Sequence, residues 1–176
     1  MDRYEVNVFP ANAAYGLAVR STPNLGINGP RAVPELVLAN AASWQRLLTG
    51  PGDLSTRPVP GTWSPVEYGC HVRDVFRLFD RRLALMLGTD DPLFPNWDQD
   101  ETAVADRYAE QDPAEVAVAL TGAAQAIATS FAAVDGEAWQ RPGRRSDGAR
   151  FTVETFARYF VHDPVHHLYD VTGRRR

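Results

Sequence analysis

Apolar residues recur at intervals of three or four along four stretches of the chain, the spacing that places side chains on one face of an α-helix. We expect these helices at about residues 34–49, 65–88, 113–134 and 152–171. The second begins with Ser64, Pro65 and Glu67, an N-cap residue, a proline and a glutamate that together form a capping box. Four helices and few strand signals predict an all-α fold, a four-helix bundle.

The segments between the helices complete this picture. Residues 89–111 form a connection after the second helix that is long enough to cross the bundle, and residues 102–110 suit a short helix within it. Residues 1–30 are rich in Gly, Pro and Asn and predict an irregular arm, with a short strand at residues 4–9 where polar and apolar residues alternate. The chain thus divides into an N-terminal arm, residues 1–30, and one helical domain, residues 31–176.

Composition narrows the protein class. A chain of 176 residues that is 44% hydrophobic can bury the core of one domain. The net charge of −4 and the lack of a basic stripe argue against nucleic-acid binding. No apolar run reaches the length of a membrane span, and the first residues lack the pattern of a signal peptide. We therefore expect a cytoplasmic protein that binds neither nucleic acid nor membranes.

The four histidines carry the candidate chemistry. His162 and His166 are four residues apart on the last expected helix, so they share a face, and His71 lies on the second helix. Three imidazoles from two helices would form a metal site with open coordination positions, which is typical of catalytic metals. Neutral imidazole suits zinc, nickel, copper or iron(II).

Helical geometry leaves a second interpretation open, in which these are buried, hydrogen-bonded histidines. On an ideal helix, His162 and His166 lie roughly 160° from the centre of the apolar stripe, and only His167 falls on the core side. Pro164 removes a backbone hydrogen bond and predicts a kink between the two histidines. Asp163 follows His162 directly, so we expect it on the surface or in a capping role.

Three sequence blocks resemble the DinB-like superfamily, which includes the bacillithiol and mycothiol S-transferases and the metal-binding domain of mycothiol-dependent maleylpyruvate isomerase. The resemblance covers about residues 31–173. It implies a four-helix bundle, often dimeric, with a long connection after the second helix and with zinc or nickel bound by His71, His162 and His166. The blocks are Trp63-Ser64-Pro65-Val66-Glu67-Tyr68, His71-Val72-Arg73-Asp74 and His162-Asp163-Pro164-Val165-His166.

Residues 94–108 resemble an actinobacterial subgroup more specifically, which agrees with a chain whose 18 basic residues are all arginine. That resemblance implies mycothiol as the thiol cofactor. The chain departs from the superfamily pattern at Pro164, where a helix former is usual. It departs again after the second histidine, where residues 167–170 replace the basic-glycine turn.

The resemblance and the metal site together predict a metal-dependent thiol S-transferase. A divalent metal lowers the pKa of a bound thiol, and the thiolate can then attack an electrophile such as an epoxide, a halide or an activated alkene. The expected partners are therefore a small-molecule thiol and an electrophilic substrate, in a protein that is often a homodimer in this superfamily.

Further residues are candidates for supporting roles. Asp74 lies one turn after His71 and could orient its imidazole, or be a surface charge. Tyr169 shares the face of His162 and His166 and could donate to a substrate. Arg158 could bind a carboxylate of the thiol, or be an exposed charge.

Two other functions stay open. A metal-dependent hydrolase would need a general base, for which Glu67 or Asp74 is the candidate, although Glu67 also suits the capping box. A non-catalytic metal-binding or stress-related bundle protein would be favoured if no pocket lay beside the histidines. Paired Glu-x-x-His motifs are absent from the sequence, which argues against a di-iron carboxylate site.

Overall fold

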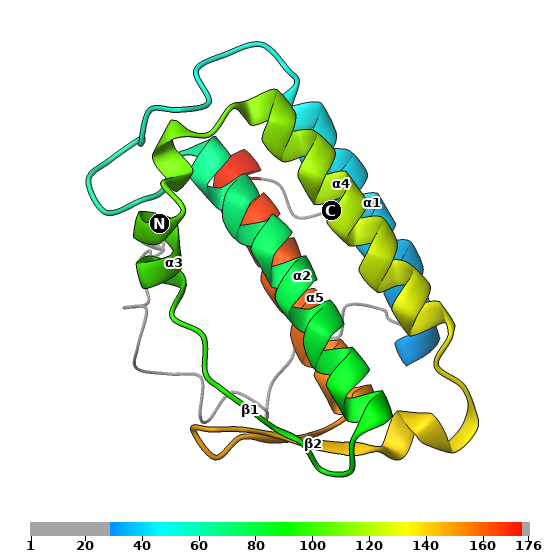
Figure 1. The fold of residues 1–176 in the computed structure, drawn as a ribbon. Coiled ribbons are helices and arrows are strands. Elements are labelled where there is room, and N and C mark those ends of the chain that lie inside the picture. The colour runs from blue at the N-terminus through cyan, green and yellow to red at the C-terminus, as the bar shows by residue number, and fades with distance from the viewer. Residues whose placement is uncertain (1–28, 174–176) are drawn as a thin grey trace, which may run out of the picture.

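The computed structural model describes residues 29–173. Four long helices dominate it, and all four were expected from the apolar spacing, with ends that differ by one or two residues (Figure 1). The arm and the strand expected before residue 29 lie outside the described residues. The four helices are α1 (Val33–Leu48), α2 (Pro65–Gly88), α4 (Pro113–Ala132) and α5 (Val153–Thr172).

Side-chain caps explain where the helices begin. The Ser64 hydroxyl accepts the Glu67 backbone N–H, and the Glu67 carboxylate accepts the Ser64 N–H at 2.8 Å, which confirms the capping box of α2. Asp112 accepts two backbone N–H groups at the start of α4. Thr152 forms a second capping box with Thr155 at the start of α5.

The order of the helices around the bundle differs from their order in the chain. α4 packs between α1 and α2, and α5 packs between the same two helices on the other side. α2 and α4 run in the same direction, with α1 and α5 behind them (Figure 1). Two neighbouring parallel helices need a connection as long as the bundle, which is why residues 89–112 travel back along α2.

That connection contains local structure of its own. It holds β1 (Leu93–Phe94), α3 (Gln99–Ala105) and a 3₁₀ turn at Tyr108–Glu110, where a short helix was expected. β1 pairs in parallel with β2 (Pro142–Arg145), which forms a hairpin with β3 (Arg150–Thr152). The sequence did not predict this sheet, because two to four residues are too few for an alternating pattern to stand out.

The core is rich in stacked aromatic rings. Phe79 stacks on Phe156 and Phe160, with centroids 4.7 and 5.0 Å apart, and Phe131 joins them from α4.

α4 is also long and apolar enough to span a membrane. One such helix is weak evidence of a membrane span, because the core helix of a soluble protein passes the same test.

Candidate metal centre

His71 is buried in the second turn of α2, at the end of the bundle where α2 begins. Only 1% of the residue is exposed. The Trp97 indole, from the connection between α2 and α4, stacks on the imidazole with centroids 5.3 Å apart and planes 7° apart. Trp63 contacts the ring at the same centroid distance. Within the described residues, neither ring nitrogen of His71 has a hydrogen-bond partner, which is costly for a buried imidazole and calls for a physical reason.

α5 brings Asp163 and His167 to His71. These two residues are one turn apart and therefore lie on one face of the helix. Asp163 Oδ2 lies 3.3 Å from His71 Nε2, and Asp163 Oδ1 lies 3.5 Å from His167 Nε2. One potential ligand atom from each of the three residues lies within 4.8 Å of the others. We call these three residues the metal cluster.

The donor atoms of the metal cluster fit a divalent cation. Asp163 Oδ2, His167 Nε2 and both nitrogens of His71 are buried and make no hydrogen bond within the described part of the chain. Polar atoms that converge without a hydrogen bond are able to act as ligands of a shared ion. Two histidines and one carboxylate form the ligand set of known catalytic zinc and iron(II) sites, and they leave coordination positions open.

In the metal cluster, the pKa shifts of His71 and Asp163 favour the protonation states that metal binding needs, a neutral imidazole and an ionised carboxylate. Burial lowers the pKa of His71, which keeps its imidazole neutral. Burial raises the pKa of Asp163, but His167 and His71 outweigh it and hold that pKa well below its usual range. Burial lowers the pKa of His167, yet Asp163 and Asp170 raise it to about 9 overall. A metal ion would therefore displace a proton from His167.

Of the trio expected from the sequence, the structure brings only His71 into the metal cluster. His162 and His166 are exposed on another face of α5, with their rings 5.9 Å apart. α5 continues without a break through Pro164, so the proline does not turn these two side chains toward His71. His166 Nδ1 instead lies 3.1 Å from Asp170 Oδ2. Metal binding by His162 and His166 stays a prediction.

The candidate supporting residues lie outside the metal cluster. Asp74 is bonded by Arg73 and Arg77, and the Tyr108 hydroxyl donates to its Oδ2 at 2.7 Å. Arg158 pairs with Glu154, one turn earlier on α5, and its side chain is 55% exposed. Tyr169 is 39% exposed near the end of the same helix.

Glu67, the other candidate base, is also engaged in structural contacts. Its carboxylate accepts the Ser64 backbone N–H, and it pairs with the Arg57 guanidinium. Burial raises the pKa of Glu67, but these bonds outweigh burial and lower it overall. Glu67 therefore acts as the capping residue of α2, as the sequence suggested.

Asp163, His167 and Trp97 were missed as site residues, and Asp163 was wrongly expected on the surface or in a cap. A signal for Asp163 and His167 was present, because on an ideal helix each lies about 20° from Phe156, at one edge of the apolar stripe. Trp97 had no such signal, since only the path of the long connection brings it to His71.

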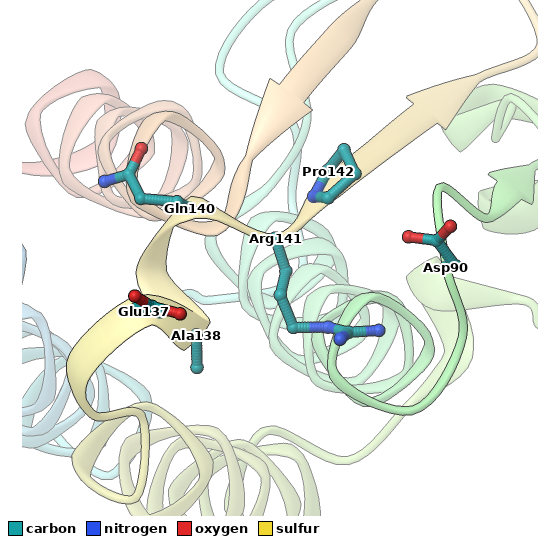
Figure 2. Close-up of a pocket in the computed structure, with 6 residues that line it drawn as sticks. All are labelled: Asp90, Glu137, Ala138, Gln140, Arg141 and Pro142. Atoms are coloured by element: carbon teal, nitrogen blue, oxygen red, sulfur yellow. The ribbon is translucent and has the colours of Figure 1, made fainter.

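Two open surface hollows lie away from the metal cluster. One, of about 400 Å³, lies on α4 beside Val118. The other, of about 650 Å³, lies at the far end of the bundle between Asp90 and the 140–142 segment (Figure 2). Its arginine, Arg141, donates to the carbonyls of Met86 and Thr89, so the cation caps the end of α2.

Comparison with known proteins agrees with this fold. The family model of the DinB superfamily matches residues 35–171, which is most of the chain. The chain belongs to the DinB superfamily. The match contains all three residues of the metal cluster, and the superfamily assignment agrees with the resemblance noted in the sequence.

A solved DinB-like fold is similar over nearly the whole length of both chains. YfiT from Bacillus subtilis, described as a probable metal-dependent hydrolase with an unusual four-helix bundle topology, matches with a TM-score of 0.74 and 16% identity. The match covers 87% of this chain and 90% of that one, and at this identity it shows a shared fold. No curated protein matches the chain.

Proposed function

We propose that this DinB superfamily protein is a metal-dependent enzyme of the hydrolase type that binds one divalent ion through His71, Asp163 and His167. The observation that carries the proposal is the convergence of buried donor atoms that make no hydrogen bond. A structural histidine cluster would use those atoms in hydrogen bonds, because an unpaired buried polar atom costs about 1–3 kcal/mol.

Each residue near the cluster has a physical task in this proposal. His71 from α2 and the Asp163–His167 pair from α5 hold the ion between two helices. Trp97 and Trp63 cover the His71 side and exclude water from it. A substrate would approach from α5, where the side chains of Asp163 and His167 are 26% and 17% exposed. When bound, the ion supplies Lewis acidity at neutral pH.

The carboxylate in the ligand set favours hydrolysis over thiol transfer. Asp163 cancels one of the two positive charges of a divalent ion and so weakens its attraction for a thiolate. Two histidines with one carboxylate occur in hydrolytic zinc sites. The description of YfiT as a probable metal-dependent hydrolase supports the same choice.

A zinc- or nickel-dependent S-transferase that uses mycothiol is the second candidate. One observation favours this second candidate. The Trp63-to-His71 block that carried the resemblance forms the start of α2, and Trp63 contacts the His71 ring in the metal cluster. In both candidates the metal site is the same, so the ligands can be tested before the reaction.

The first experiment measures metal content by mass spectrometry on purified, untagged protein. We expect about one zinc, nickel or iron ion per chain, lost in His71→Ala, Asp163→Ala and His167→Ala while helical circular dichroism is kept. His162→Ala and His166→Ala are the matched controls on the same helix, and we expect both to retain the ion because they are exposed.

Two outcomes would contradict the ligand assignment. If the two control variants lose the ion and Asp163→Ala keeps it, the ligands are those expected from the sequence motif. If the wild type cannot be loaded with any of these metals, the protein is a non-catalytic bundle. With metal binding established, metal-dependent ester hydrolysis lost in Asp163→Ala would support the hydrolase, and conjugation that needs added thiol would support the transferase.

A further inference from the structure

The two nitrogens of His167 face two different groups. Nε2 points to Asp163 in the metal cluster, and Nδ1 lies 3.3 Å from Asp170 Oδ2. A neutral imidazole binds a metal through the nitrogen that carries the lone pair, so the other nitrogen must carry the hydrogen. A carboxylate at Nδ1 accepts that hydrogen and leaves the lone pair on Nε2, directed at the cluster.

Building on the metal site proposed above, we propose that Asp170 is a positioning residue for it: the carboxylate holds His167 in the tautomer and ring orientation that bind the ion. A carboxylate behind a metal-bound histidine also makes the imidazole a stronger donor, because its charge stabilises the N–H that faces it. Asp170 contributes no atom to the metal cluster itself.

The place of Asp170 in the helix supports this role. It lies in the last turn of α5, which ends at Thr172, where the unpaired carbonyls carry partial negative charge. An acidic residue there is unfavourable for helix stability unless it has a cationic or donor partner. Both His166 and His167 supply that partner, with nitrogens 3.1 and 3.3 Å from the same oxygen.

This geometry also assigns a place to His166, which the sequence motif had singled out as a ligand. Its Nδ1 shares Asp170 Oδ2 with His167, so it lies behind the cluster rather than in it. His166, His167 and Asp170 are close enough to hold a second ion of their own. His166 and His167 already hydrogen-bond the same Asp170 oxygen, however, whereas the donor atoms of the metal cluster make no hydrogen bond within the described residues.

The test is a calorimetric titration of metal-free protein with Zn²⁺, repeated with Co²⁺ to record the visible spectrum of the bound ion. We expect Asp170→Ala to weaken binding about 10- to 100-fold and to shift the Co²⁺ bands. Asp170→Asn keeps an acceptor oxygen without the charge, so we expect a smaller loss and a spectrum close to wild type. Glu154→Gln, at the start of α5, is the matched control and should bind like wild type.

Each result separates this inference from the proposed function. If wild type binds one ion and His167→Ala does not, but Asp170→Ala binds as tightly as wild type with an unchanged Co²⁺ spectrum, the positioning role is wrong and the metal site stands. If wild type binds two ions and Asp170→Ala loses only one, Asp170 is a ligand of a second site and the inference is wrong. If wild type binds none, the proposed function itself fails.

Discussion

Cys70 illustrates how burial decides the chemistry of a single residue. It precedes His71 in the chain, but its side chain is fully buried, and its Sγ lies 3.3 Å from Gln111 Oε1. Burial raises the pKa of the Cys70 thiol to about 12, so almost none of it is thiolate at neutral pH. Cys70 is therefore a small core residue rather than a nucleophile.

We therefore expect the native protein to resist alkylation by iodoacetamide at pH 8, and the unfolded protein to react fully. Intact-mass spectrometry would measure the fraction modified over time in buffer and in concentrated urea. Rapid modification of the native protein at Cys70 would show that the thiol is accessible and ionised, against this prediction.

At the scale of the element, the capping box of α2 helps to position the metal cluster, because His71 lies in the second turn of the helix that this capping box begins. We expect Ser64→Ala to destabilise the protein by about 1 kcal/mol, since it removes the acceptor for the Glu67 N–H. For a chain of this size that loss lowers the midpoint of thermal unfolding by about 2–4 °C. Thermal denaturation followed by circular dichroism measures the shift.

Asp112→Ala is the control for this prediction. It removes the cap of α4, which holds no residue of the metal cluster, and should cost similar stability. Of these two variants, we expect only Ser64→Ala to weaken metal binding in addition to lowering stability. Equal metal affinity in both variants would show that the first turn of α2 does not position His71.

At the scale of the whole molecule, the metal cluster joins parts of the chain that are far apart in sequence, since His71 lies on α2 and the other ligands on α5. An ion that binds only the folded state stabilises it, by about 2.7 kcal/mol when free metal is 100 times its dissociation constant. We therefore expect added Zn²⁺ to raise the thermal midpoint by several degrees and a chelator to reverse the rise. His71→Ala should show no rise, and a rise equal to wild type would place the ion elsewhere.

The superfamily, the four helices and their starting points could be predicted from the sequence. These features depend on interactions between residues close in the chain: apolar spacing along one face, an N-cap serine or aspartate, a proline in the first turn. His71 was found for the same reason, because it belongs to a local block at the start of α2. The three short strands were missed, because two to four residues are too few to show an alternating pattern and β1 pairs with a segment about 50 residues away.

The tertiary structure decided which residues of the last helix face His71. A spacing of four residues is met equally by His162 with His166 and by Asp163 with His167, and a motif alone favours the pair of histidines. The rotation of α5 is set instead by burial of Phe156 and Phe160 against α2 and α4, and that rotation turns Asp163 and His167 toward His71. The sequence by itself determined that histidines from two helices could hold a metal, and the packing of the aromatic core decided which side chains meet there.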